Sequence, residues 1–317
     1  TRSTAGNATV TANGATASGA EAAGTTFFNS SSAGNATLIA NGGSGGGTGG
    51  SIRFCDQSRG GTARVEVFGN GKLDISGHPG LTVGSIEGDG DVFLGANNLT
   101  VGSNNLSTNF SGVIQDGGNL GGTGGSLTKI GTGKLVLSHR NTYTGGTTVN
   151  RGRLIVNTRG RSGTGSGPVQ VNRGRLGGMG TIAGAVTLGT GSGLEATLSP
   201  GYHHGSNPGT LTIQSPLTFN SDATYEIEVN SSSETVDKIV ALGVTINSSA
   251  QTSFADLGSG TFTVGNVFTV IDNTSATPIA GTFSNLPDGS TFTSNGNTYQ
   301  VNYSGGDGND LTLTIVP

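Results

Sequence analysis

Three short runs of alternating apolar residues between positions 127 and 156 constrain the fold more than any other feature of this chain. The runs contain Leu127 and Ile130, then Leu135 and Leu137, then Val149, Leu154 and Val156. Glycine-rich turns separate them at Gly131–Gly133, Gly145–Gly146 and Gly152. A period of two bounded by Gly and Asn indicates a strand with one buried face. Three such strands within 30 residues, with no helical period between them, predict one turn of a β-solenoid rather than part of a sandwich.

The same segment, LTKIGTGKLVLSHRNTYTGGTTVNRGRLIV, carries a longer pattern of Gly, Leu and Asn-Thr-Tyr at fixed places. The positions that carry it are Leu127, Lys129, Gly131, Gly133, Leu135, Leu137, Asn141, Thr142, Tyr143, Gly145, Thr147, Val149, Gly152 and Leu154. In these residues the segment resembles the passenger-associated transport repeat, also called the autotransporter-associated β-strand repeat. The resemblance covers about a tenth of the chain. It implies a β-solenoid, but no single activity, because such repeats occur in adhesins, in secreted enzymes and in other surface proteins.

Internal repeats near the N-terminus predict how successive turns of the solenoid, or rungs, stack. AGNATVTANG begins at Ala5, AGNATLIANG begins at Ala33, and a weaker copy, GGTARVEVFGNG, begins at Gly60. The first two copies are offset by 28 residues. Equal spacing indicates equal rungs, each packing its apolar face on the next. We therefore expect Val10, Leu38 and Val65 to lie in one interior column.

Three regions differ in composition. Residues 1–116 are rich in Gly, Ser and Thr, residues 117–198 carry the β-strand repeat and a basic stripe, and residues 199–317 have longer strands with less Gly. The stretch 268–314 resembles the C-terminal ending of secreted passenger proteins that bear these repeats. We expect an all-β chain without helices. It is predicted to form one continuous right-handed parallel β-solenoid of about a dozen rungs, closed by a more regular β-rich C-terminal cap.

Composition favours an extracellular protein. Charged residues make up 11% of the chain, where about 25% is usual. Few Lys, abundant Thr, Ser, Asn and Gly, and a single Cys fit a bacterial extracellular or cell-surface β protein. Cys55 is predicted to be a passive thiol, with an intermolecular bridge as the alternative. No apolar run approaches the ~20 residues that span a membrane, so no membrane insertion is expected. The chain opens at Thr1 rather than Met, and a processed or arbitrarily chosen end is expected there.

Basic residues are concentrated in one part of the chain. Nine of the 15 Lys and Arg residues lie between positions 117 and 194, which contain no Asp or Glu. Arg151 and Arg153 occupy the same places in one VNRGRL segment as Arg173 and Arg175 in the next, where the family pattern has small polar residues. Stacked like charges are unfavourable unless they are solvated or paired. We interpret the four as a contact stripe for acidic polysaccharide, DNA or an acidic surface of a neighbouring subunit, with a solvated face as the alternative.

One segment matches a metal-binding pattern. GGDGNDLTL at Gly305–Leu313 fits the calcium nonapeptide, which needs Gly for tight turns and Asp oxygens for a hard cation. That site is built from stacked copies, and this sequence has one. We therefore favour a hairpin turn and no cofactor, with Asp307 and Asp310 as the ligands if calcium binds.

Other patterns are interpreted as structural. Tyr202, His203 and His204 lie in a Pro/Gly-rich stretch without an evident third metal ligand, so we expect an exposed loop. Glu226 and Glu228 share one strand face, and we predict a solvated face rather than the paired carboxylates of a glycosidase. GTGK at 131–134 lacks the spacing of a phosphate-binding loop.

These observations favour a secreted structural protein over an enzyme. The first hypothesis is a subunit of an extracellular bacterial fibre, in which copies stack head to tail through their strand edges. The second is a monomeric autotransporter passenger or adhesin stalk on the cell surface. A polysaccharide-active enzyme on a solenoid is the third, and the scarcity of charged residues disfavours it.

Overall fold

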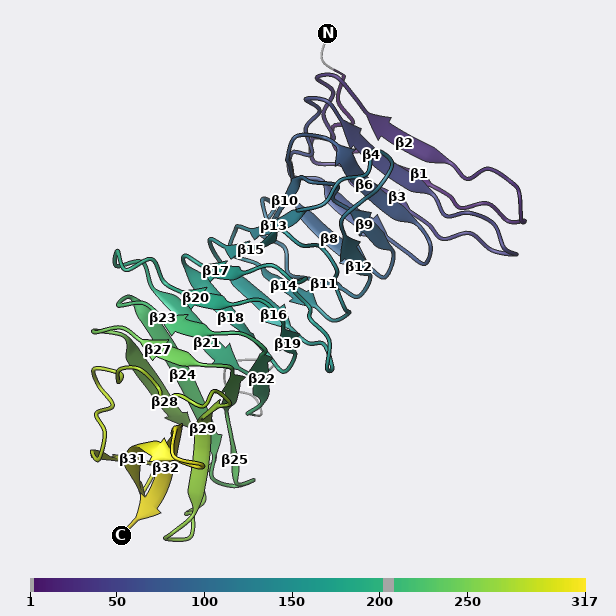
Figure 1. Ribbon diagram of the computed structural model, residues 1–317. Coiled ribbons are helices and arrows are strands. Elements are labelled where there is room, and N and C mark those ends of the chain that lie inside the picture. The colour runs from purple at the N-terminus through teal and green to yellow at the C-terminus, as the bar shows by residue number, and fades with distance from the viewer. Residues whose placement is uncertain (1–2, 202–207) are drawn as a thin grey trace. The chain divides into compact units, whose positions relative to one another are not determined.

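The regular structure of the computed structural model, which describes residues 3–201 and 208–317, is mainly parallel β-strands (Figure 1). The strands belong to two compact units. The first comprises Thr1–Leu154 and Ser162–Pro168, and the second comprises Ile155–Arg161 and Val169–Pro317. The described residues contain no helix, as expected from the sequence. The division into regions 1–116, 117–198 and 199–317 stays a prediction.

The strands of the first unit belong to three parallel sheets, and from β7 (Leu81–Val83) to β13 (Ser126–Lys129) the chain visits all three in turn. The β1 sheet contains β1 (Thr9–Ala12), β3 (Thr37–Ala40), β5 (Arg64–Val67), β8 (Ser85–Gly88), β11 (Thr108–Phe110) and β14 (Lys134–Leu137). The β2 sheet contains β2 (Gly24–Phe27), β4 (Ser51–Cys55), β6 (Lys72–Gly77), β9 (Asp91–Phe93) and β12 (Val113–Gln115). The β7 sheet contains β7 (Leu81–Val83), β10 (Asn98–Val101), β13 (Ser126–Lys129) and β15 (Gly146–Val149). This arrangement confirms the predicted parallel β-solenoid.

The register of the β1 sheet confirms the predicted interior column. Val10 pairs with Leu38, and Leu38 pairs with Val65. Leu38 and Val65 are fully buried, and Val10 is half-buried. Full burial of such a side chain contributes about 1.5–3 kcal/mol, so a column of them stabilises every rung that it crosses.

Asparagine side chains stack outside this column. The Asn35 amide donates to the Asn7 side-chain carbonyl at 3.1 Å, and the Asn41 amide donates to the Asn13 carbonyl at 2.8 Å. Each pair joins residues 28 positions apart, which is the offset of the two AGNAT copies. The sequence repeat therefore sets both the apolar core and the polar turns.

The second unit also has three sheets. One contains β18 (Gly174–Gly178), β21 (Ala196–Pro200), β24 (Ala223–Asn230), β25 (Thr235–Val236) and β28 (Gln251–Asp256). Another contains β17 (Val169–Val171), β20 (Val186–Leu188), β23 (Leu217–Phe219) and β27 (Val244–Ile246). The third contains β19 (Thr181–Ile182), β22 (Thr210–Ile213), β26 (Lys238–Ala241), β29 (Val267–Asn273), β30 (Thr291–Ser294), β31 (Asn297–Gly305) and β32 (Asp310–Val316). β16 (Arg153–Val156) begins in the first unit and ends in the second.

The C-terminal strands form the predicted cap. Pairing changes from parallel to antiparallel at β29, which pairs with β32, while β31 pairs with β32 and with β30. Phe283, from the segment between β29 and β30, is fully buried against Phe219 at 5.1 Å and Tyr225 at 6.1 Å between ring centroids. This ring closes the apolar interior of the second unit.

The cap also covers the outer edges of the last parallel strands. The Asn285 carboxamide accepts from the N–H of Thr252 on β28 at 2.8 Å and donates to its carbonyl oxygen at 2.7 Å. On β27, the N–H of Ile246 donates to the carbonyl oxygen of Ala280 at 2.7 Å. These backbone groups of Thr252 and Ile246, which an open edge would expose, are therefore satisfied within the chain.

Candidate functional site

The segment 127–156 contributes both apolar and polar side chains to the core of the first unit. Leu127 on β13, Leu135 on β14 and Val149 on β15 are all buried. In the β7 sheet, Leu127 pairs with Leu99 of β10 and with Thr147 of β15. The apolar positions of the sequence pattern are thus those that pack one rung on the next.

Lys129, the Lys of this pattern, is buried with 1% of its surface exposed. Its ammonium group donates to the carbonyl oxygen of Ile130, to that of Gly131 at 3.2 Å and to that of Arg151 at 3.4 Å. These carbonyls replace part of the water that burial removes. Burial nevertheless lowers the pKa of Lys129 to about 8. The side chain joins the turn after β13 to the turn after β15 and adds no charge to the surface, contrary to its place in the predicted basic stretch.

The Asn-Thr-Tyr motif holds the loop that follows β14. Asn141 accepts from the N–H of Ile114 at 2.7 Å, and its amide donates to the carbonyl oxygen of Gly163 at 2.6 Å. The buried hydroxyl of Tyr143 forms a hydrogen bond with the hydroxyl of Thr147, and burial raises the pKa of Tyr143. Both motif residues therefore satisfy buried polar groups rather than face a ligand.

The four arginines of the predicted contact stripe differ in their surroundings. Arg151 and Arg153 in the first unit and Arg173 in the second are exposed. Arg175, in the second unit, is half-buried and donates to the carboxylate of Glu226 on β24. The contact with a polyanion or a second subunit stays a prediction, and Arg175 would enter it already paired with a carboxylate.

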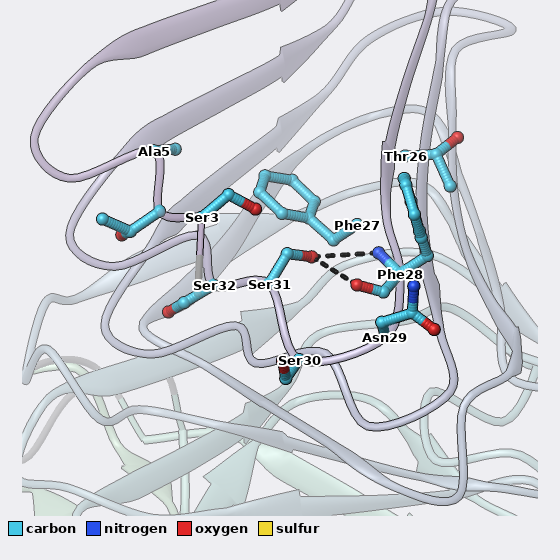
Figure 2. A pocket seen from close by; sticks show the side chains of 10 residues that line it. Ser3, Ala5, Thr26, Phe27, Phe28, Asn29, Ser30, Ser31 and Ser32 are labelled. Carbon is cyan, nitrogen blue, oxygen red and sulfur yellow. Dashed lines mark hydrogen bonds between the residues drawn. The ribbon is translucent and has the colours of Figure 1, made fainter. Parts of the chain in front are cut away.

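A hollow of about 400 Å³ lies at the end of β2 in the first unit (Figure 2). Its lining is Ser3, Thr4, Ala5, Thr26, Phe27, Phe28, Asn29, Ser30, Ser31 and Ser32. The Phe28 ring is 57% exposed, whereas Phe27 is buried. The sequence interpretation missed this hollow, although two adjacent Phe residues where a strand ends signal that one ring faces out, since neighbouring side chains of an extended segment point to opposite faces.

Comparison with known protein families gives a match for the segment that carries the buried Lys129. Residues 127–156 match the family model described as passenger-associated-transport-repeat. The segment is a passenger-associated transport repeat. The repeat supports an autotransporter passenger-type protein, at the surface or secreted, of a kind that is typically structural or adhesive. No curated protein matches the chain. In the described part of the chain, no helix is both long and apolar enough to cross a membrane.

Outside the passenger-associated repeat, the prediction of a solvated face at Glu226 and Glu228 is wrong. Glu226 is 4% exposed and Glu228 is fully buried. The Glu226 carboxylate pairs with Arg175. The segment after β24 folds back beside Glu228, so that β25 pairs with β24. There the N–H of Asp237 donates to the Glu228 carbonyl oxygen at 2.8 Å, and the Glu228 N–H donates to the Asp237 carboxylate at 3.1 Å. Burial raises the pKa of Asp237 to about 8.

The calcium-like segment, also outside the repeat, forms the favoured hairpin turn. β31 and β32 are antiparallel, with Gly305 opposite Asp310. Asp307 is exposed, and the Asp310 carboxylate accepts from the N–H of Asn273 at 2.9 Å. Among the described residues, no group of three or more His, Cys, Asp or Glu side chains could hold a metal ion. Calcium binding stays a prediction, and Tyr202, His203 and His204 lie outside the described residues.

Cys55 is a free thiol at the end of β4, partly exposed. Burial, with the nearby carboxylates of Asp56 and Asp74, raises the pKa of Cys55. A raised pKa keeps the thiol protonated and unreactive at neutral pH, which is what a passive thiol requires. The alternative of an intermolecular bridge stays a prediction.

Proposed function

We propose that this chain is the stalk of an autotransporter passenger-type protein, a structural β-solenoid that works as a single molecule at the cell surface or after secretion. The observation that carries the proposal is the cap at the end of the second unit. Phe283 fills the interior of that unit, and Asn285 satisfies the backbone of Thr252 on β28. In a solenoid closed in this way, the outer edges of β27 and β28 are partly bonded within the chain, which disfavours their extension by a parallel strand of another chain.

The cap also distinguishes the stalk hypothesis from the hypothesis of a head-to-tail fibre. A fibre built by parallel edge stacking needs the outer edge of the last rung to be open. In the second unit that edge is occupied by Ala280 on β27 and by Asn285 on β28. The fibre would require the cap to leave or to dock through its antiparallel strands, and we rank it below the stalk for that reason.

Burial of the acidic residues supports a structural rather than an enzymatic stalk. A glycosidase needs two carboxylates beside a substrate cleft, and Glu226 and Glu228 are covered. The polar residues of the repeat, Lys129, Asn141 and Tyr143, are committed to bonds within the rung. These three buried side chains hold the rungs together and are not available to a substrate.

The proposal is tested by the mass of the purified chain in solution. Light scattering coupled to gel filtration, over a range of protein concentrations at neutral pH, should give the monomer mass of 31.3 kDa throughout. Negative-stain images of the same samples should show single particles. Filaments, or a mass that grows with concentration, would overturn the stalk in favour of the fibre.

A further inference from the structure

We propose that the hollow at the end of β2 binds a neutral saccharide unit, with the Phe28 ring against its C–H face. This adds a binding activity to the first unit that the stalk itself does not require. A volume of about 400 Å³ falls within the roughly 300–1,000 Å³ range of small-molecule sites. The hollow is therefore large enough for one or two sugar residues.

The chemistry of the lining selects a neutral, hydroxyl-rich ligand. None of the ten lining residues carries a charge, and the Asp56 carboxylate beside them already accepts the N–H of Asn29 at 3.0 Å, so the lining itself offers no ion pair to a charged ligand. The exposed ring of Phe28 offers an apolar plane of the kind that packs against the C–H groups of a pyranose. Aromatic surface beside a few polar groups is the usual composition of a small-ligand site.

Several lining groups are free to bond with such a ligand. The hydroxyls of Thr4, Ser31 and Ser32 already accept backbone N–H groups, from Gly6 at 3.1 Å, Phe28 at 3.0 Å and Gly34 at 3.1 Å. Among the described residues, four lining side chains form no hydrogen bond within the chain, namely Ser3, Thr26, Ser30 and Asn29. Three hydroxyls and one carboxamide supply both donors and acceptors, which is what sugar hydroxyls need.

The turn that carries Phe28 is fixed by its own bonds. The Ser31 hydroxyl accepts from the Phe28 N–H at 3.0 Å and donates to its carbonyl oxygen at 2.9 Å, as Figure 2 shows. Asn29 adopts a left-handed conformation with φ of 52°, and its N–H donates to the carboxylate of Asp56 at 3.0 Å. Phe27 stacks on Phe54 at 4.7 Å between ring centroids. Preorganisation of this kind lowers the entropy that a ligand must overcome.

Saturation-transfer NMR on the full chain tests the proposal. The probes are glucose, galactose, N-acetylglucosamine and their β-linked disaccharides, with glucuronic acid as the charged comparison. We expect transfer to the ring C–H protons of at least one neutral probe. Phe28→Ala should weaken that binding at least about tenfold, because it removes the stacking surface. Asn29→Gly should weaken it about fivefold, because it removes the carboxamide while Gly still accepts the positive φ.

Phe68→Ala is the matched control, since Phe68 is 38% exposed in the same unit but does not line the hollow. It should bind as the wild type does, and circular dichroism should show that all three variants keep the wild-type melting curve. Absence of transfer from every neutral probe would overturn the proposal, as would equal transfer in Phe28→Ala or stronger binding of glucuronic acid. None of these outcomes bears on the stalk, which is tested by mass alone.

Discussion

The ammonium group of Lys129 lies 3.4 Å from the carbonyl oxygen of Arg151, 22 residues further along the chain. A side chain that would ordinarily be solvated thus joins two turns of the solenoid from within the core. The carbonyl oxygens around it hold a charge that the apolar core would otherwise reject. The Lys of the passenger-associated repeat is therefore a structural residue.

Replacement of Lys129 by Met should lower the free energy of unfolding by about 2 kcal/mol, because buried carbonyl groups lose their donor. Chemical denaturation followed by circular dichroism measures the change. Arg151→Ala is the control, since it removes an exposed side chain but keeps the carbonyl oxygen that Lys129 contacts, and it should stay within about 0.5 kcal/mol of the wild type. Equal stability of Lys129→Met and the wild type would contradict the role of the bond.

The lowered pKa of Lys129 also predicts a pH dependence. Between pH of about 8 and the ordinary value of 10.5, the unfolded chain binds more protons at this site than the folded chain. Stability of the first unit should therefore rise with pH across this window. Denaturation curves at several pH values test this, and the rise should be absent in Lys129→Met. The same slope in that variant would assign the effect to another group.

The raised pKa of Asp237 in the second unit predicts that stability changes with pH in the opposite direction. Its pKa rises from 3.8 to about 8 on folding, so the folded chain binds more protons between these values. Stability of the second unit should therefore fall as pH rises from about 4 to about 8 and level off above. Asp237→Asn removes the titrating group and should flatten the curve, although it also loses one acceptor for the N–H groups of Gly209 and Glu228. A slope that persists in this variant would show that Asp237 is not its source.

Two glycines with the same backbone conformation should respond differently to Ala. Gly131 has φ of 68°, and an added Cβ would lie 1.9 Å from the carbonyl oxygen of Gly102. Gly121 has φ of 69°, and an added Cβ would meet nothing within 4 Å. Gly121→Ala should cost only the left-handed strain, about 1–2 kcal/mol, whereas Gly131→Ala should cost several more or prevent folding. Similar melting temperatures for the two variants would mean that the rungs approach less closely at Gly131.

The repeats explain how much of the fold could be predicted. The 28-residue offset between the AGNAT copies fixes which residues stack, so the register of Val10, Leu38 and Val65 follows from the sequence. Side chains two residues apart on a strand point to the same face, so Lys129 lies on the same face as the buried Leu127. The sequence therefore contains the signal for the burial of Lys129. The charge of Lys129 concealed that signal, because buried Lys is rare.

The burial of Glu226 and Glu228 could not be predicted from the strand. They alternate with the inward-facing Tyr225, Ile227 and Val229, which correctly places the two carboxylates on the outer face. The partners of these residues come from other segments, because Asp237 bonds to the backbone of Glu228 and Arg175 pairs with the Glu226 carboxylate. Alternation along one strand carries no information about such a tertiary contact.

The most direct test of the capped stalk is the mass in solution of the Phe283→Ala variant, measured by light scattering beside the wild type and Phe68→Ala. Loss of the buried ring should cost about 3–5 kcal/mol and release the segment that covers β27 and β28. We predict a monomeric wild type and control, and a Phe283→Ala variant that self-associates with rising concentration through its exposed edges. A wild type that polymerises with its cap intact, or a Phe283→Ala variant that stays monomeric and melts as the wild type does, would contradict the account.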